Sequence, residues 1–106
     1  MLTIEQFQQM EIKIARVIKA QPHPNADRLL VLTVDVGGIQ KEIVAGIARH
    51  YTPETLVNKL VVLVNNLEPA TIRGVTSHGM LLAAQDAQDL SLLIPERPVS
   101  PGSSVR

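Results

Sequence analysis

The chain has 106 residues, enough for one domain around one hydrophobic core, because single domains commonly contain about 100–150 residues. Ten Lys and Arg balance ten Asp and Glu, so the formal net charge is zero, which excludes a strongly basic nucleic-acid coat and an acidic disordered tail. A hydrophobic fraction of 45% predicts a globular chain, and the absence of cysteine excludes disulfides, thiolate chemistry and cysteine-based zinc sites.

The first predicted element is a short helix at the N-terminus. Thr3 and Gln6 fit a capping box, with Thr3 as the N-cap, and the helix is expected to end near Met10. From Glu11 the apolar residues alternate, as is typical of a strand. The alternation slips near Ala15–Arg16, and Val17 and Ile18 are both apolar, which we interpret as a β-bulge in a long, bent strand.

Two further strands and a helix follow. Residues 22–27 are rich in Pro, Asn and Asp and predict a turn. Residues 30–36 alternate, and the two glycines after them permit the positive φ of a hairpin into a third strand at Gln40–Ala45. A threonine cap followed by proline predicts a short helix beginning at residues 52–54.

The second half of the chain predicts two more strands. The continuous apolar run Leu60–Val64 indicates a buried fourth strand, and residues 78–84 form a fifth after a polar loop. Residues 90–94 are an apolar patch outside these five strands, and the prolines that follow keep the tail extended. Three strands, a helix and two strands match an all-β OB-fold, a five-stranded Greek-key barrel, here with an extra C-terminal segment.

Catalysis and metal binding find no support in the sequence. His23, His50 and His78 match no local ligand spacing, so we expect them to be surface histidines. Residues 74–79 resemble a nucleophile elbow, but Val75 stands where that motif requires glycine. We therefore expect no enzyme activity, no metal and no cofactor.

The polar loop between the fourth and fifth strands is the candidate binding site, since loops between OB strands commonly bind oligonucleotides. Arg73 beside Gly74 can donate two hydrogen bonds to a phosphate, and Asn66 and Ser77 add uncharged donors. Met80 can pack against a sugar or a base. The ordinary alternatives are turn formation, a surface ion pair for the arginine and core packing for the methionine.

Aromatic residues are scarce, and this constrains the nucleic acid that the chain can bind. Only Phe7 and Tyr51 are aromatic. Proteins that bind unstructured single strands stack bases on several aromatic rings, each worth about 1–3 kcal/mol. The composition therefore favours recognition of a folded shape over recognition of a single strand.

No apolar run approaches the roughly 20 residues of a membrane helix, and the N-terminus lacks the basic start and apolar stretch of a signal peptide. We therefore expect a cytoplasmic protein without a membrane partner.

Several segments together resemble one known family: residues 23–29 (HPNADRL), 34–37 (VDVG), 45–48 (AGIA), 66–69 (NLEP) and 73–84 (RGVTSHGMLLAA). This family is the structure-specific tRNA-binding domain, found at the C-terminus of bacterial methionyl-tRNA synthetases, in an endothelial monocyte-activating cytokine of animals and as free-standing bacterial proteins. The match runs from about residue 11 to residue 106, so the whole chain, 1–106, is interpreted as one tRNA-binding domain. Its own Met1 makes it most similar to the free-standing form; an excised synthetase domain is the alternative.

The resemblance implies a non-catalytic OB-fold that binds the outer corner of the L-shaped tRNA with little sequence preference. It also implies a homodimer, acting alone or with an aminoacyl-tRNA synthetase. The residues implied to contact tRNA are Arg28, Asn66, Arg73, Ser77 and Met80. Glu68 and Thr71 stand where the family often has lysine, and Arg28 also replaces a lysine. We therefore expect weaker and more salt-sensitive binding than a lysine-rich relative shows.

This hypothesis requires Arg28, Asn66, Arg73 and Ser77 to lie on one ridge of the molecule. The apolar patch at residues 90–94 also favours the homodimer, with packing against the barrel's own end as the alternative. A competing function is that of a CsaA-type export chaperone, which shares the dimeric OB framework and binds protein through its apolar surface. A metal-dependent hydrolase using the histidines is a third hypothesis.

Overall fold

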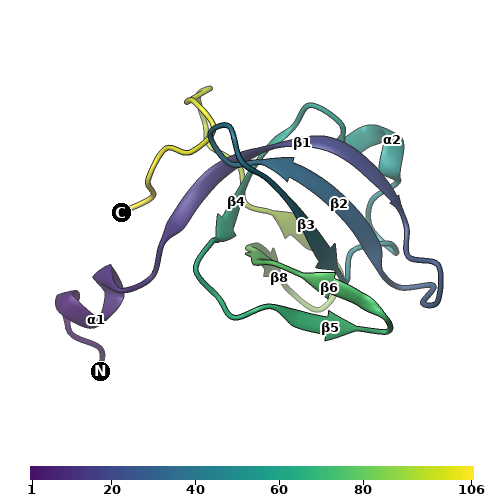
Figure 1. The fold of residues 1–106 in the computed structure, drawn as a ribbon, viewed down its shortest axis with the longest axis horizontal. Helices are drawn as coiled ribbons and strands as arrows, with labels where there is room; N and C mark the ends of the chain where they lie inside the picture. The colour runs from purple at the N-terminus through teal and green to yellow at the C-terminus, as the bar shows by residue number, and fades with distance from the viewer.

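Residues 1–106 are all described by a computed structural model, in which strands predominate (Figure 1). The elements in chain order are α1 (Ile4–Gln8), β1 (Ile12–Pro22), β2 (Leu30–Asp35), β3 (Gln40–Ala45), α2 (Pro53–Leu56), β4 (Leu60–Val64), β5 (Ala70–Ile72), β6 (Val75–Ser77), β7 (Met80–Leu81), β8 (Ala83–Gln85) and β9 (Leu90–Leu92). Five strands form one sheet in the order β3-β2-β1-β4-β7, and the pairs β5-β6 and β8-β9 form two small sheets.

The main sheet bends into a nearly closed barrel because the two halves of the long strand β1 pair with different strands. Its first half, from Ile12 to Arg16, pairs antiparallel with β4, and its second half, from Arg16 to Pro22, pairs antiparallel with β2. The outer strand β3 then approaches the opposite end of the sheet, where the His78 amide donates to the Glu42 carbonyl at 2.9 Å. The predicted five-stranded OB-type barrel is confirmed.

Two hydrophobic clusters hold the barrel together. The main core contains twelve buried residues, among which Leu32, Ile43 and Leu63 are completely covered. A smaller cluster on the outer face of β1 and β4 contains Ile12, Ile14, Val62 and Val64. Strand β4 is therefore covered on both faces, which explains why its sequence is a continuous apolar run rather than an alternating one.

The bulge predicted in β1 is confirmed, and it lies at the consecutive apolar residues Val17 and Ile18 rather than at Ala15–Arg16. The register against β2 shifts between Val17 and Lys19, so Ile18 is the extra residue and its side chain is exposed. The change of pattern at 15–16 has another cause. Ile14 faces the small cluster while Ala15 and Val17 face the main core, so neighbouring residues are buried without any bulge.

The two helices form where expected, with one difference in capping. The capping box of α1 is confirmed, since the Thr3 hydroxyl accepts from the Gln6 amide and the Gln6 side chain accepts from the Thr3 amide. Helix α2 places Leu56 in the main core. Thr52 occupies its N-cap position but makes no side-chain cap bond, because its hydroxyl lies 3.4 Å from that of Thr55. Neither helix has the length and apolarity needed to cross a membrane.

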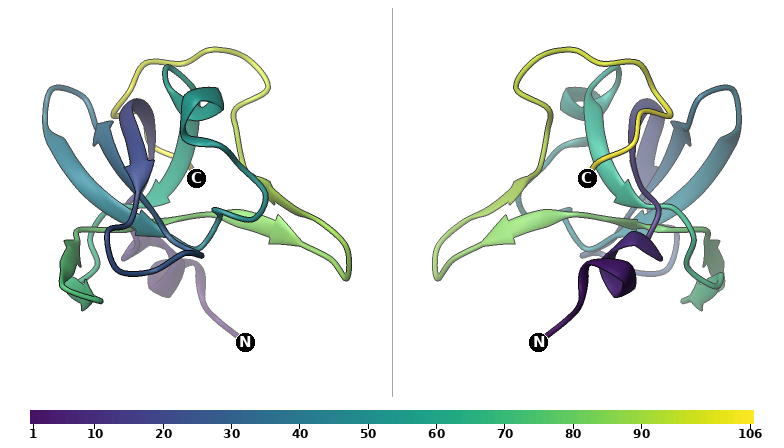
Figure 2. Two further views of the ribbon diagram at one scale, coloured as in Figure 1. Left: turned by 90° about the vertical axis from the view of Figure 1, so that its right-hand side faces the viewer. Right: turned by 90° about the vertical axis from the view of Figure 1, so that its left-hand side faces the viewer.

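The region after β4 differs most from the prediction. The expected loop contains the β5–β6 hairpin, and the expected fifth strand is divided into β7, paired with β4, and β8, paired with β9. The patch expected outside the barrel is also partly internal, because Leu92 is buried in the main core while Leu93 and Ile94 are exposed. Figure 2 shows the β8–β9 hairpin extending away from the barrel.

The C-terminal tail returns to the barrel instead of remaining extended. Ile14 donates to the Ser103 carbonyl at 2.9 Å and accepts from the Gly102 amide at 2.7 Å, so the tail runs along the free edge of β1. At this point Gly37 and Gly102 pack backbone to backbone, and a Cβ on Gly37 would lie 3.2 Å from the Gly102 Cα. The glycine turn between β2 and β3 thus also forms the seat of the tail.

Candidate nucleic-acid interface

Arg73 occupies the tip of the β5–β6 hairpin. Ile72 pairs with Val75, which leaves Arg73 and Gly74 as a two-residue turn. Both turn residues have positive φ, 52° and 89°, as a type I′ turn requires. Glycine suits this conformation, whereas a left-handed arginine is uncommon. The turn displays the Arg73 side chain to solvent.

Arg28 lies next to this tip although it comes from the turn before β2. Its side chain is exposed, and its carbonyl accepts from the Ala48 amide at 3.2 Å, which fixes the backbone of the turn. Arg28 and Arg73 line the same hollow, of about 510 Å³. The complete lining is Ala26, Asp27, Arg28, Leu29, Ile72 and Arg73.

Neither arginine of this hollow is neutralised by a direct ion pair. The single ion pair of the molecule joins Arg97 and Glu96 at 3.7 Å, and both of those side chains are highly exposed. Asp27 is the one carboxylate in the lining of the hollow, against two guanidinium groups. The hollow therefore presents two unpaired planar cations, which suit bidentate binding of phosphate or carboxylate.

The turn and the hairpin are joined by hydrogen bonds near their tips. His23 Nε2 lies 2.9 Å from the Ile72 carbonyl oxygen, and the Asn25 side-chain amide donates to the Arg73 carbonyl at 3.3 Å. His23 is 5% exposed, so the expectation of a surface histidine was wrong at this position. No group of three His, Asp or Glu side chains is arranged to hold a metal ion.

Asn66 lies at the other end of the segment that leads to Arg73. Its side-chain oxygen accepts from the Glu11 amide at 2.9 Å, and its amide nitrogen donates to the Gln9 carbonyl at 2.8 Å. In Figure 1, α1 lies at the left, whereas the turn of the β5–β6 hairpin lies at the right. Asn66 does not line the hollow that contains the two arginines, and both polar groups of its side chain are hydrogen bonded within the protein.

Ser77 is also used inside the fold. It is 4% exposed, its hydroxyl accepts from the Val44 amide at 2.9 Å, and it donates to the Gly79 carbonyl at 3.0 Å. These bonds attach the end of β6 to β3. Of the four residues expected on one ridge, Arg28 and Arg73 line one hollow. The sequence could not reveal the internal bonds of Asn66 and Ser77, because their backbone partners Glu11 and Val44 are 55 and 33 residues away.

Met80 is half exposed, at 49%, and belongs to a different part of the surface. It borders an apolar hollow of about 190 Å³ at the end of the barrel. The other residues of this lining are Val44, Ala45, Gly46, Ile47, Leu81, Ala83, Leu90 and Leu92. Met80 can contact an apolar group there, but it does not line the hollow that contains the two arginines.

Both aromatic rings are engaged within the protein. Phe7 packs against the small hydrophobic cluster. Tyr51 packs against the main core, its hydroxyl accepts from the Leu92 amide at 2.9 Å, and the Lys59 ammonium lies 5.5 Å from its ring centroid. Neither ring is presented as a platform for base stacking.

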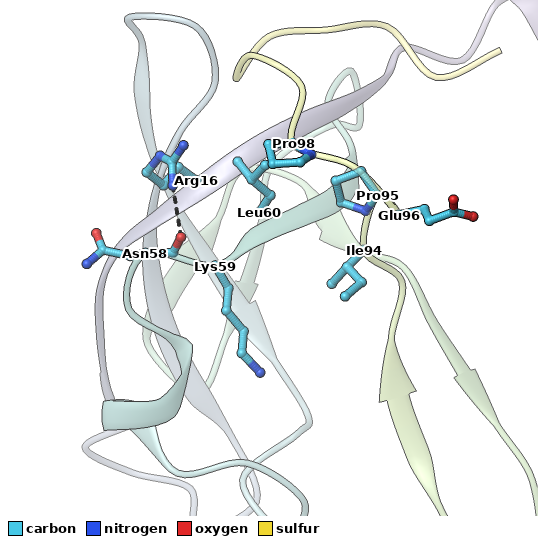
Figure 3. Close-up of a pocket in the computed structure, with 8 residues that line it drawn as sticks. All are labelled: Arg16, Asn58, Lys59, Leu60, Ile94, Pro95, Glu96 and Pro98. Atoms are coloured by element: carbon cyan, nitrogen blue, oxygen red, sulfur yellow. Dashed lines mark hydrogen bonds between the residues drawn. The ribbon is translucent and has the colours of Figure 1, made fainter.

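A second hollow, of about 460 Å³, lies between the start of β4 and residues 94–98 (Figure 3). It contains two cations that the sequence did not single out, Arg16 and Lys59. Arg16 donates to the Asn58 carbonyl at 2.9 Å, so part of its guanidinium group serves the local backbone. Glu96 also lines this hollow, and none of the five predicted contact residues does.

The chain is similar to known proteins over nearly its whole length. The model of a family described as a putative tRNA binding domain matches residues 12–104. The methionine–tRNA ligase of Pyrococcus furiosus is 46% identical over 105 residues, 99% of this chain and 14% of the ligase. That of Methanoregula boonei is 49% identical over 106 residues, 100% of this chain and 16% of the ligase. The chain thus spans a small part of the length of these relatives.

Solved structures match over the full chain. A MetRS-related protein from Pyrococcus horikoshii superposes with a TM-score of 0.94 at 32% identity, covering 100% of this chain and 98% of that one. The chaperone CsaA from Bacillus anthracis superposes with a TM-score of 0.90 at 28% identity, covering 100% and 99%.

Proposed function

The chain belongs to the tRNA-binding domain family, and on that premise we propose that it is a non-catalytic module that binds folded tRNA by its shape. The observation that carries this proposal is the hollow that Arg28 and Arg73 share. Two guanidinium groups held by a short turn and a hairpin tip can each bind a phosphate, which positions an RNA without reading its bases. The expected place of action is the cytoplasm.

Recognition of shape is supported by the state of the aromatic side chains. Phe7 packs against the small cluster and Tyr51 against the main core, so base stacking has no evident platform. A folded RNA offers its phosphates at fixed spacings, and two cations on a turn and a hairpin that are hydrogen bonded to each other can match such spacings without stacking.

We assign different roles to the five residues expected at the site. Arg28 and Arg73 contact the RNA backbone, and Met80 contacts an apolar part of the ligand from a separate hollow. Asn66 and Ser77 support the site by fixing the two ends of the segment that carries Arg73.

Binding assays with three RNAs test the proposal. Gel-shift titrations with mixed tRNA, a single-stranded RNA of equal length and an RNA duplex are expected to show the highest affinity for tRNA. Equal affinity for all three would contradict recognition by shape. If none of the three RNAs is shifted at low salt, nucleic-acid binding itself is contradicted.

A synthetase is the proposed protein partner. The chain resembles a short part of several methionine–tRNA ligases, so a role in presenting tRNA to such an enzyme is consistent with the relatives. Addition of the protein to a methionyl-tRNA synthetase that lacks this domain is expected to raise aminoacylation at low tRNA concentration. No change at any tRNA concentration would contradict this partnership.

A homodimer is the proposed assembly. Helix α1 has no buried residue, and Met1, Leu2 and Ile4 expose large apolar side chains around it. A second copy that covers this end would remove them from water. Sedimentation equilibrium is expected to give twice the chain mass of 11.6 kDa, and Ile4→Glu is expected to give a monomer. A measured mass of 11.6 kDa for the parent protein, that of one chain, would contradict the dimer.

The second candidate function is that of a protein-binding chaperone. The likeness to the chaperone CsaA from Bacillus anthracis covers nearly all of both chains and is the observation that favours it. In that case the exposed apolar residues would act and Arg73 would not. Suppression of aggregation that survives Arg73→Ala, together with no tRNA binding by the parent, would favour this function over the first.

A further inference from the structure

His23 is one of two buried polar residues in the molecule, and both of its ring nitrogens are hydrogen bonded. Nδ1 accepts from the Asn25 backbone amide at 2.9 Å, and Nε2 lies 2.9 Å from the Ile72 carbonyl oxygen. The first bond stays within the turn that carries Arg28. The second reaches the hairpin that carries Arg73, so one side chain bridges the two parts of the candidate site.

The partners determine where the ring carries its hydrogen. A backbone N–H can only donate, so Nδ1 must present its lone pair to Asn25. A carbonyl oxygen can only accept, so Nε2 must carry the hydrogen and donate it to Ile72. The ring of His23 is thus a neutral imidazole with a single tautomer compatible with both bonds.

This bridge acts on a hairpin that has little other support at its tip. Strands β5 and β6 have three residues each and form a sheet of their own, and an isolated two-stranded hairpin is marginally stable in water. Ser77 ties its base to β3 through Val44. At the tip, His23 bonds the Ile72 carbonyl and the Asn25 side chain bonds the Arg73 carbonyl.

We propose that His23 is a positioning residue for tRNA binding, which fixes the Arg73 turn against the Arg28 turn without touching the RNA. The inference rests on the proposed function of the two arginines. A buried ring cannot contact a phosphate, but it can set the spacing between two guanidinium groups that do. Phosphates on a folded RNA have fixed spacings, so a mobile hairpin tip would weaken binding even with both arginines present.

Two substitutions separate the two bonds of the ring. His23→Asn keeps an acceptor for the Asn25 amide, as in an Asx turn, and loses the donor to Ile72. His23→Gln keeps a donor near the position of Nε2 and loses the ring acceptor. Loss of one hydrogen bond that orders the site is expected to lower tRNA affinity by about threefold to tenfold in H23N. H23Q is expected to bind closer to the parent.

A double-mutant cycle distinguishes positioning from a general loss of structure. Gel-shift titrations are made with the parent, H23N, Arg73→Ala and the double variant, at a temperature well below each unfolding midpoint. If His23 acts by placing Arg73, the double variant binds as Arg73→Ala does, because the positioned group is already gone. An equal further loss in the Arg73→Ala background would overturn the inference, as would unchanged affinity in H23N.

Amide hydrogen exchange provides a readout that does not depend on RNA. The amide of Val75, which pairs with Ile72, is expected to exchange faster in H23N than in the parent, and H23Q is expected to restore protection. Unchanged exchange in H23N would show that His23 does not hold the hairpin tip in place, even if the variant binds tRNA well. A parent that clamps its hairpin but binds no tRNA would refute the proposed function, and the role given to His23 would fall with it.

Discussion

Single residues divide into those that the site displays and those that hold it in place. Arg28 and Arg73 are exposed on one hollow, whereas the side chains of Asn66 and Ser77 form hydrogen bonds with backbone atoms far away in the sequence. Residue type and motif could identify all four as important. They could not separate contact from support, because that distinction depends on tertiary partners such as Val44, which no local pattern reveals.

Ser77→Ala tests the supporting role. The substitution leaves the Val44 amide without its partner inside the barrel, and a buried unpaired donor costs about 1–3 kcal/mol. Chemical denaturation is expected to show a loss of that size in the free energy of unfolding. Ser91→Ala is the control, since Ser91 is exposed and makes no side-chain hydrogen bond. Equal stability of the two variants would contradict the role of Ser77.

Asp86 provides a prediction on pH. Hydrogen bonds from the Asp89 and Gln88 amides favour its carboxylate and lower its pKa below the ordinary value of 3.8. Since the pKa is lower in the folded than in the unfolded chain, this contribution to stability is present above pH 3.8 and is lost as the pH falls through the folded pKa. An NMR titration of the two amide protons is expected to have its midpoint below 3.8. A midpoint above that value would contradict the hydrogen bonds from these two amides to the Asp86 carboxylate.

Secondary-structure elements were predictable where one periodicity decides them. The strands β2 and β4 were found because alternation or a continuous apolar run marks each. The β5–β6 hairpin was missed because its strands have three residues each, too few for a periodicity. The Arg73–Gly74 pair carried the only local signal, since glycine at the second position suits a two-residue turn.

The packing of the C-terminal tail against the turn between β2 and β3 can be tested by substitution of the turn glycines. Gly37 and Gly38 both have positive φ, so alanine at either costs about 1–2 kcal/mol of backbone strain. At Gly37 the new Cβ would also lie 3.2 Å from backbone atoms of Pro101 and Gly102, whereas at Gly38 nothing lies within 4 Å. Gly37→Ala is therefore expected to lower the unfolding midpoint further than Gly38→Ala. Equal midpoints would show that the tail does not pack on this turn.

The whole molecule carries no net charge, so its affinity for RNA must come from the placement of charges rather than their sum. The order of the strands sufficed to predict the barrel. The return of the tail to β1 and the burial of Leu92 in the main core were not predictable, because both depend on contacts between distant segments. The resemblance to a family supplied the ligand class, which the fold alone cannot give.

Charge placement can be tested by comparing two glutamates. Glu68 is exposed in the link between β4 and β5, and Glu96 lines the other hollow. Glu68→Lys and Glu96→Lys change the net charge equally. Glu68→Lys is expected to raise tRNA affinity by about twofold to fivefold more than Glu96→Lys does, measured at moderate salt. An equal gain in both would indicate an effect of net charge alone.

Arg28 and Arg73 are proposed to bind phosphates of a folded tRNA, and the salt dependence of binding tests this proposal. Affinity is determined by gel shift from low to moderate salt for the parent, Arg28→Ala, Arg73→Ala and the control Arg97→Ala. Affinity falls as salt rises, so the slope of log affinity against log salt is negative. Its magnitude is expected to become smaller by about 0.7–0.9 when either of the two arginines is removed, and to stay at the parent value for Arg97→Ala. Slopes that are the same in all four proteins would contradict the claim.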